Sequence, residues 1–469
     1  MNAKKIILVV IVVLATNIIT FFAAGTFMLE PAEKDPAPET AQQPELINEI
    51  IAILEAEHID EIDREKLLEG TIEGLLEALD DPQASYMTPD DYENFMVQTE
   101  GTYGGIGIEV FTDNDYVTVM APISGTPAEE IGLSSGDRIL SVDGVNLVGE
   151  DLNKAVSLMR GEPGTDLSFK VDRPGVDEEL EFEISREKIE IDTVEYEMLE
   201  NNIGYLELNS FGQTSGQEFE DALEEMKQDG MEGLVIDLRN NPGGLLDAAV
   251  DIADLLVPEG PITHIADRDR TLKTMSSNSA ALGIPLVALV NETSASASEV
   301  LAGALQDTES GTIIGTKTFG KASVQNVREL SSGGALSYTV AQYKTPSERV
   351  IDEKGLSPDL EVDPPAIAEL AMKPISTSLV QGDEGEKVET LQMILEETGH
   401  YDHEITGDYD QATADALKEF QEDQEIKVTG EMSEMVVRRF HEEIEKLRKE
   451  DDKKLERALE ELLKEFEEL

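Results

Sequence analysis

The sequence predicts a multi-domain α/β protein, and three features of the chain carry that prediction. The chain has 469 residues, which at roughly 150 residues per domain corresponds to about three domains. Apolar residues make up 40% of it, which is enough to build hydrophobic cores. From about residue 187 onward, short apolar strands alternate with amphipathic helices, a pattern typical of a sheet covered by helices.

The N-terminus predicts where the protein works. Lys4 and Lys5 precede 19 uncharged residues, Ile6 to Ala24, close to the roughly 20 that a membrane-spanning helix needs. Basic residues before this run and acidic residues after it predict a single-pass anchor in the cell membrane, with the body outside the cytoplasm. A cleaved signal peptide, which would give a secreted protein, is the alternative. We assign residues 1–28 to the anchor or signal, and the acidic, Pro-rich residues 29–45 to an extended linker.

The composition excludes several classes of function. The chain has 100 acidic and 36 basic residues, so it lacks the clustered Lys and Arg that bind nucleic acid. We interpret the net charge of −64 as a solvating surface, with a specific site for cations or basic substrates as the alternative. No cysteine is present, which excludes thiol catalysis, disulfides and Cys-ligated metals. The five histidines show no metal-ligand spacing, so we expect neither a metal nor a cofactor.

Residues 46–95 predict a helical segment. Leu46, Ile50 and Leu54 recur at helical spacing, and a second apolar stripe follows from about Asp63. Two short amphipathic helices cannot bury their apolar faces alone. We therefore expect this segment to pack on another domain or to form a homodimer.

Ser296 is the candidate nucleophile. It lies where a fully apolar strand, residues 285–290, gives way to an apolar helix, and its neighbours Ala295 and Ala297 are small enough to admit a substrate carbonyl. Serine is inert until a base removes its proton, and the nearest histidine, His264, belongs to a different segment. A lysine can serve instead if desolvation holds it neutral.

Lys321 is the candidate base. It follows Gly320 at the start of a strand-like stretch, in which a period of two places Lys321, Ser323 and Gln325 on one face. Gln325 is thus placed to orient the lysine amine. The N–H groups of Ala297 and of the Gly243-Gly244 turn would supply the oxyanion hole. On spacing alone, a simple helix cap at Ser296 and a surface lysine remain alternatives.

Three ordered blocks resemble the S41 family of carboxyl-terminal processing peptidases. They are DLRNNPGGLLDAAVDIADLL (Asp237 to Leu256), VNETSASASEVLAGALQD (Val290 to Asp307) and GTKTFGKASVQ (Gly315 to Gln325). The resemblance implies a crotonase-like α/β protease core at residues 187–370. It implies Ser296 as nucleophile, Lys321 as base, Gln325 as its support, and the backbone N–H groups of Gly243, alternatively Gly244, and of Ala297 as the oxyanion hole.

Two departures from the family pattern stand out. The sequence has Lys-Ala-Ser at residues 321–323, where the family often has Lys-Gly-Thr or Lys-Gly-Ser. It has Glu348 where a glycine often stands, which leaves only the geometry of that turn in question.

Residues 96–186 resemble a PDZ domain, which the family places ahead of its protease core. The implied carboxylate-binding loop, whose backbone N–H groups would hold a substrate's C-terminal carboxylate, is Gly105, Ile106, Gly107 and Ile108. Arg138 and Arg160 are candidate charge partners, although exposed arginines balancing local acid explain them equally well. Substrates are therefore expected to be proteins or peptides with accessible C-termini.

Residues 376–440 resemble a three-helix peptidoglycan-binding domain. The resemblance lies in the opening QGDEGEKVETLQ and in the later Gly407, Thr413 and Phe420-Gln421, and it implies peptidoglycan as a partner. The tail, residues 441–469, is mostly Glu, Lys and Leu, which predicts a solvated charged helix.

The leading hypothesis is an exported endopeptidase that recognises protein C-termini and cleaves near them, in regulation or quality control of the cell envelope. The alternative is a non-catalytic scaffold that joins a PDZ domain to a wall-binding domain. A wall hydrolase is weaker, because glycoside cleavage needs two carboxylates facing one bond and no such pair can be singled out.

Overall fold

The computed structural model describes residues 43–113, 115–176, 178–363, 370, 373, 375–450 and 452–468. The expected anchor, and the linker up to residue 42, lie outside these ranges. Within them, no helix combines the length and apolar character that a bilayer crossing requires. The chain forms two compact units, Met1–Asp80 and Asp81–Leu469.

The first unit contains the two expected helices, α2 (Gln43–Glu57) and α3 (Arg64–Glu77). Asp63 caps α3, because its carboxylate accepts the N–H groups of Glu65 and Lys66 at 3.0 and 3.2 Å. Much of the apolar surface on these helices is uncovered, and Leu75 is 66% exposed. The hairpin thus leaves apolar faces open, as the sequence pattern predicts.

The second unit begins with a short strand and a capped helix. Strand β1 (Ser85–Met87) precedes α4 (Pro89–Glu100). Thr88 and Asp91 form a reciprocal capping box and Pro89 occupies the first helical position.

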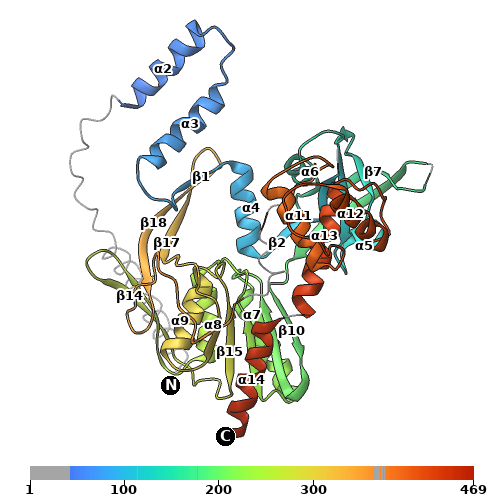
Figure 1. Ribbon diagram of the computed structural model, residues 1–469. Coiled ribbons are helices and arrows are strands. Elements are labelled where there is room, and N and C mark those ends of the chain that lie inside the picture. The colour runs from blue at the N-terminus through green and yellow to red at the C-terminus, as the bar shows by residue number, and fades with distance from the viewer. Residues whose placement is uncertain are drawn as a thin grey trace, which may run out of the picture. The chain divides into compact units, whose positions relative to one another are not determined.

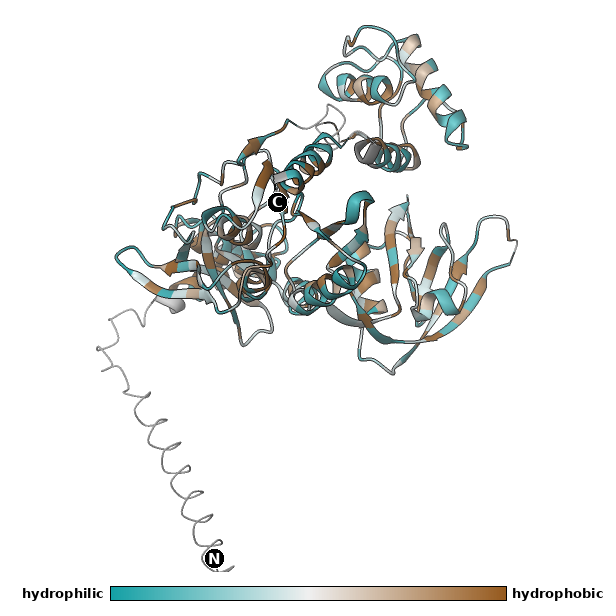
Figure 2. Cartoon of the chain, turned by 90° about the horizontal axis from the view of Figure 1, so that it is seen from below, coloured by the Kyte–Doolittle hydropathy of each residue, from teal (hydrophilic) through white to brown (hydrophobic). Residues whose placement is uncertain are grey.

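The expected PDZ domain is an antiparallel sheet with two helices. Strands β2 (Thr102–Gly105) and β9 (Glu187–Glu190) pair with each other in a separate two-stranded sheet. The main sheet has the order β3 (Ile108–Asp113), β4 (Tyr116–Pro122), β5 (Arg138–Val142), β7 (Asp166–Asp172) and β8 (Leu180–Ser185), with β6 (Val145–Asn146) on β5. Helices α5 (Pro127–Glu130) and α6 (Leu152–Met159) accompany it. Buried and exposed residues alternate along β7. Figure 2 shows apolar (brown) and polar (teal) residues interspersed along the strands of the chain.

The expected protease core is built on a mostly parallel sheet. Its order is β10 (Val194–Met198), β11 (Ile203–Leu208), β12 (Gly233–Asp237), β15 (Leu286–Val290), β16 (Thr312–Gly315) and β19 (Leu360–Glu361). Only β10 runs antiparallel to its neighbour. Strands β12 and β15 are buried at every position, which explains why β15 is entirely apolar and why β12 is apolar up to its last residue, Asp237.

Helices cover both faces of this sheet. On one face Leu234 and Ile236 of β12 pack with α7 (Ser215–Gln228), α8 (Leu246–Leu256) and α9 (Ala297–Asp307). On the other face Val235 packs against α14 (Lys453–Glu468). The core therefore has three layers, and the multi-domain α/β prediction is confirmed (Figure 1).

The prediction of a solvated charged tail is wrong for α14. Ala458 and Leu462 are fully buried, and Phe466 packs against the same cluster. Their spacing of four residues forms an apolar stripe inside a strongly charged sequence. The charge count concealed that stripe, although the periodicity was present in the sequence.

A second sheet lies beside the core and carries the strand after Lys321. Strand β18 (Ala335–Lys344) pairs with β17 (Ser323–Glu329), with β1 and with β13 (Gly260–Ala266), which continues to β14 (Thr271–Ser277). In the turn after β18, Glu348 has φ of +63°, the left-handed region that favours glycine. The turn forms nonetheless, because the Glu348 N–H reaches the Thr345 carbonyl at 2.8 Å.

The third domain is the expected small helical bundle. It contains α11 (Glu386–Glu397), α12 (Gln411–Asp423) and α13 (Glu434–Glu450), and Phe420 stacks on Phe440 at 4.2 Å between ring centroids. The motif residue Gln421 accepts the N–H groups of Thr429 and Gly430 at 2.7 and 2.9 Å. This glutamine therefore holds a loop, so its presence in the motif reflects folding.

We predict that Leu462→Ala destabilises the protease core by about 2–4 kcal/mol, because it leaves a cavity between α14 and the sheet. The neighbouring Leu463 is 40% exposed, and Leu463→Ala should cost about 0.5 kcal/mol or less. Urea unfolding of the two variants measures the difference. Equal, small effects would mean that α14 does not pack on the sheet.

Candidate active site

One cavity gathers the five core residues that the sequence singled out. It has a volume of about 1000 Å³, and its lining includes Ser296, Lys321, Gln325, Gly243 and Ala297. It opens at the carboxyl ends of β12 and β15, where the connecting loops of parallel strands leave the sheet. The segment from Pro82 to Met87 and the β17 strand complete its wall.

Ser296 differs from the two serines that flank it in the S-A-S-A-S run. The Ser294 and Ser298 hydroxyls are fully buried and donate to the carbonyls of Leu238 and Asn241 at 2.8 and 2.9 Å. Ser296 is only partly buried and lines the cavity. Its backbone has φ of +57° and ψ of −114°, a sparsely populated conformation for a residue with a side chain. The surrounding hydrogen bonds thus hold a strained serine at the start of α9.

We call residues 291–296 the nucleophile loop and residues 239–244 the oxyanion turn, after the roles that the sequence resemblance implies for them. The two are joined directly, because the Asn241 carbonyl accepts the Ala295 N–H at 3.1 Å. Asn240 and Asn291 add a reciprocal pair, N–H to amide oxygen at 3.0 Å and amide to amide at 2.8 Å. The Asn-Asn pair of the turn therefore fixes the nucleophile loop.

Gly243 lies directly against Ser296. A Cβ at this position would meet Ser296 Cβ at 2.8 Å and Ala297 N at 2.9 Å, and the residue has φ of +103°. Only glycine fits such a close approach. The Gly243 N–H donates to Asn241 Oδ1 at 2.8 Å. Within the described ranges, no backbone or side-chain hydrogen bond uses the N–H groups of Gly244 or Ala297, which leaves these two as open donors.

Lys321 and Gln325 share the cavity with Ser296 but are not bonded to it. Among the hydrogen bonds of the described residues, none joins the side chains of Lys321 and Ser296, or those of Lys321 and Gln325. The Gln325 amide instead donates to the Gln83 carbonyl at 2.9 Å. Strand β17 begins only at Ser323, and its register with β18 shifts between Val324 and Gln325. This irregularity interrupts the strict alternation that the sequence argument assumed.

His264, the other base considered, is engaged elsewhere. Its Nδ1 lies 2.8 Å from Thr274 Oγ1 and its Nε2 lies 3.1 Å from the Pro346 carbonyl. It does not line the cavity that holds Ser296. Among the residues that line this cavity, Lys321 is the one Lys, Arg or His.

The buried carboxylate of Glu299 joins the two halves of the site. One oxygen accepts the N–H groups of Ser296 and Lys321 at 3.0 and 2.8 Å. The other accepts the Thr318 hydroxyl at 2.6 Å and the Gly320 N–H at 2.8 Å. Burial raises the pKa of Glu299, although these four hydrogen bonds act to lower it. A single side chain thus fixes the backbone of the candidate nucleophile relative to that of the candidate base.

Tyr343 joins the same two residues from the carbonyl side. Its hydroxyl lies 2.8 Å from the Ser296 carbonyl and also contacts the Lys321 carbonyl. Burial raises the pKa of Tyr343 well above its usual value, and the charges of Glu299 and Asp352 act in the same direction. The hydroxyl therefore stays protonated and can donate.

Sequence reasoning missed both Glu299 and Tyr343. Glu299 had a local signal, because Ser296-x-x-Glu299 at a helix start is the capping-box pattern. Tyr343 had none, since it reaches the site from β18 through the sheet register alone.

The PDZ residues lie in two different surroundings. Gly105 ends β2, and Ile106 is a core residue of the domain with 2% exposure. The carbonyl of Gly107 accepts the Ile123 N–H at 2.9 Å, and Ile108 opens β3. The buried Ile106 and the hydrogen bond of the Gly107 carbonyl therefore hold the loop between β2 and β3 in place.

The two candidate arginines are not equivalent. Arg138 pairs with Asp113 and Asp172 at 3.5 and 3.8 Å, and Asp113 lies at the far end of β3 from Ile108. Arg160 contacts the Asn94 side chain, and its Cζ lies 5.2 Å from the ring centroid of Tyr103, on the strand that enters the loop. Only Arg160 is near the predicted carboxylate loop.

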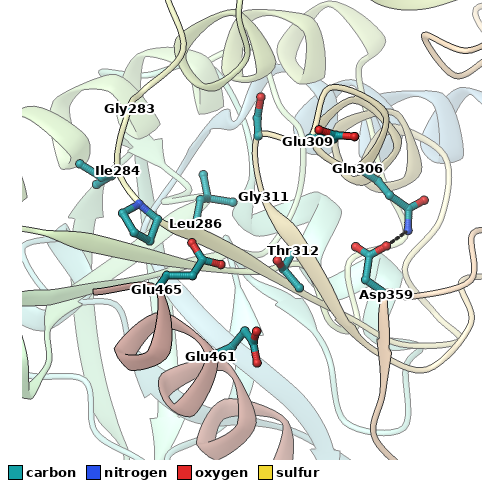
Figure 3. Close-up of a pocket in the computed structure, with 12 residues that line it drawn as sticks. Gly283, Ile284, Leu286, Gln306, Glu309, Gly311, Thr312, Asp359, Glu461 and Glu465 are labelled. Atoms are coloured by element: carbon teal, nitrogen blue, oxygen red, sulfur yellow. Dashed lines mark hydrogen bonds between the residues drawn. The ribbon is translucent and has the colours of Figure 1, made fainter. Parts of the chain in front are cut away.

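A second cavity, of about 820 Å³, contains none of the candidate site residues that the sequence singled out. It lies where β15 and β16 begin, and carboxylates of Glu309, Asp359, Glu461 and Glu465 line it (Figure 3). Asp359 is already bonded to Gln306 at 2.9 Å and to the Ile313 N–H at 2.8 Å. No Lys or His is among its lining residues, and the described part of the chain holds no His, Cys, Asp and Glu cluster suited to a metal ion.

Family models match each part of this architecture. Peptidase family S41 matches residues 202–362, and a PDZ domain matches residues 118–173. A peptidoglycan binding domain matches residues 384–439, and an N-terminal domain described for the activating protease CtpB matches residues 26–91.

Whole-chain relatives agree with these matches. The "Carboxy-terminal processing protease CtpA" of Bacillus subtilis (strain 168) is 30% identical over 99% of this chain and 99% of its own length. A "Probable CtpA-like serine protease" of Staphylococcus aureus (strain MSSA476) is 34% identical over 87% of this chain and 82% of its own. Among solved structures, a photosystem II D1 C-terminal processing protease is 32% identical, covers 69% of this chain and 94% of its own, and has a TM-score of 0.41.

The fold, the serine site and these relatives define a serine-type endopeptidase with a PDZ domain. The chain belongs to peptidase family S41, and within it to the carboxy-terminal processing proteases, with a peptidoglycan-binding domain appended.

We predict that Glu299→Gln lowers kcat by about tenfold to a hundredfold, because a misplaced reacting group costs up to that factor. The variant replaces one acceptor oxygen by an NH₂ group that must face N–H donors, which should also destabilise the core by about 1–3 kcal/mol. Peptide cleavage and urea unfolding measure the two effects. Glu309→Gln, an exposed carboxylate just after α9, is the matched control. Wild-type kcat in Glu299→Gln would contradict the assigned role.

Proposed function

We propose that this protease cleaves exported proteins near their C-termini through a Ser296–Lys321 dyad. One observation carries the proposal: a single cavity at the carboxyl ends of β12 and β15 contains the strained Ser296, the Lys321 side chain and the oxyanion turn. Two buried groups, Glu299 and Tyr343, bond to the backbone of both dyad residues. Such an arrangement is suited to acyl transfer.

In the proposed reaction, neutral Lys321 Nζ takes the proton from Ser296 Oγ as Oγ attacks the scissile carbonyl carbon. The carbonyl oxygen becomes an oxyanion and accepts N–H groups from Ala297 and from the Gly243-Gly244 turn. Lys321 then returns the proton to the leaving amine as the C–N bond breaks. Water, deprotonated by Lys321, hydrolyses the ester on Ser296 and completes the cycle.

The resting contacts predict what substrate must change. Gln325 supports Lys321 only after it exchanges the Gln83 carbonyl for the lysine amine. Gly243 contributes to the oxyanion hole only after its N–H leaves Asn241, whereas Gly244 needs no such change. We infer that the open structure is a resting state and that the dyad assembles when a substrate enters.

The PDZ domain would select the substrate. The loop of Gly105, Ile106, Gly107 and Ile108 would bind a C-terminal carboxylate through backbone N–H groups while the peptide extends a sheet edge. Arg160, beside Tyr103, is better placed than Arg138 to add a positive charge. Cleavage near a free C-terminus would follow.

We further propose an envelope location. The apolar run in residues 1–28 would anchor the protein with its body outside the cytoplasm, or export it if cleaved. Peptidoglycan would hold residues 376–440 near the wall. The uncovered apolar faces of α2 and α3 favour a homodimer.

The non-catalytic scaffold is the competing proposal. It leaves unexplained why Ser296 alone of three serines faces the cavity in a strained conformation. It also leaves unexplained the glycine packing of Gly243 against Ser296. These features have a cost that a scaffold would have no reason to retain.

We predict that Ser296→Ala and Lys321→Ala each lower kcat by at least about a thousandfold, since neither nucleophile nor base can be replaced within the dyad. Cleavage of a reporter protein with a flexible C-terminal tail measures the loss. Lys317→Ala, an exposed lysine four residues away, should retain wild-type activity.

An amidated tail on the same reporter tests the PDZ assignment separately and should raise KM.

Equal cleavage of the reporter by Ser296→Ala and by wild type would contradict the dyad assignment. Absence of cleavage of any extended substrate by wild type would favour the scaffold.

A further inference from the structure

The last helix of the chain returns to the protease core after the wall-binding domain. Strand β19 leaves the core at Glu361, the three-helix domain follows, and α14 then packs on the sheet face formed by β12, β15 and β16. The apolar stripe on α14 begins in its first turn with the partly buried Leu455 and continues with the fully buried Ala458. The first turn of α14 therefore lies at a defined place on the sheet.

Asp452, directly before α14, binds the side chain of Arg239, the residue at which the oxyanion turn begins. Its Oδ1 accepts Arg239 Nη1 at 2.7 Å and the Leu455 N–H at 3.0 Å, so it caps the helix and pairs the arginine together. Arg239 is the first residue of the oxyanion turn, and its Nε lies 2.9 Å from both carboxylate oxygens of Asp237. Tyr205 completes the group by donating to Asp237 at 2.7 Å.

Arg239 needs both of these carboxylates. Its side chain is only 17% exposed, so an unpaired edge of the guanidinium would be costly. Burial acts to lower the pKa of Arg239, but Asp237 and then Asp452 hold this pKa above its usual range. Asp237 holds Nε and Nη2, whereas Asp452 alone holds Nη1.

Lys454, two residues further, bonds to the root of the nucleophile loop. Its Nζ donates to the Val290 carbonyl at 3.4 Å, and the residue is 5% exposed. Val290 is the last residue of β15, directly before the loop that ends in Ser296. Burial and the charge of Arg239 lower the pKa of Lys454. One helix turn thus contacts the starts of both loops that build the active site.

We propose that Asp452 and Lys454 are positioning residues for the protease reaction, which act by holding the oxyanion turn and the nucleophile loop at their roots. Neither residue lines the catalytic cavity, so any effect on turnover must pass through Arg239 and Val290. The segment after the wall-binding domain is therefore part of the catalytic apparatus. This inference rests on the proposed function, because it assigns the two loops the roles of oxyanion hole and nucleophile.

The test compares kcat, KM and affinity for a peptidyl boronate, which mimics the tetrahedral intermediate, in the full-length protein. Asp452→Ala should lower kcat by about tenfold or more and lower the affinity for the boronate by a similar factor. KM should change by less than about twofold. Asp452→Asn keeps an acceptor oxygen for Arg239 and should recover part of kcat. Lys454→Met keeps the volume, removes the amine, and should lower kcat in the same way.

Glu456→Ala is the control, because Glu456 is an exposed acid on the same helix, and it should leave kcat and KM unchanged. A purely structural role would lower the melting temperature while the folded fraction kept wild-type kcat and boronate affinity, and that result overturns the inference. If Asp452→Ala does not fold, Asp452→Asn and Lys454→Met decide by the same measurements. If the wild type cleaves nothing, the proposed function is refuted. If the wild type is active and the Asp452 variants have the same kcat, only this inference is refuted.

Discussion

The carboxylate of Glu299 accepts four hydrogen bonds, and the geometry of the active site depends on them. Ser296 begins a helix, whereas Lys321 precedes a strand of a different sheet, so no regular secondary structure fixes one relative to the other. Glu299 binds the N–H groups of both residues, and Tyr343 contacts both carbonyls. Burial makes this clamp stiff, because a buried carboxylate that lost a partner would leave polar groups without hydrogen bonds.

The rest of the core extends this constraint outward. The oxyanion turn is joined to the nucleophile loop through Asn241, which accepts the Ala295 N–H, and a close glycine contact brings Gly243 against Ser296. Helix α14 covers one face of the sheet that carries these loops, and Asp452, directly before this helix, contacts Arg239. Hydrogen bonds thus fix the backbone of the candidate site, whereas none in the described part of the chain joins the side chains of Lys321 and Gln325. Under the proposed function, such a division suits an enzyme whose loops are preorganised and whose base is completed by substrate.

Much of this architecture could be predicted from the sequence, because local signals were strong. The apolar strand before Ser296 and the capping box at Thr88 were each visible in a few residues. Contacts between distant segments were not, and Gln325 bonds to Gln83 through a pairing that no local pattern encodes. The α14 stripe was missed because the high charge of the tail outweighed the apolar periodicity of Ala458 and Leu462, which are fully buried in the structure.

The most direct test of the account is a crystal structure of the protein with a peptidyl boronate in the site. We predict a covalent bond from boron to Ser296 Oγ, with Lys321 Nζ within about 3.2 Å of that oxygen. The Glu299 contacts should remain as they are, and a boronate oxygen should accept the Ala297 N–H. Boron bound to another residue, or Lys321 turned away from a bonded Ser296, would contradict the account.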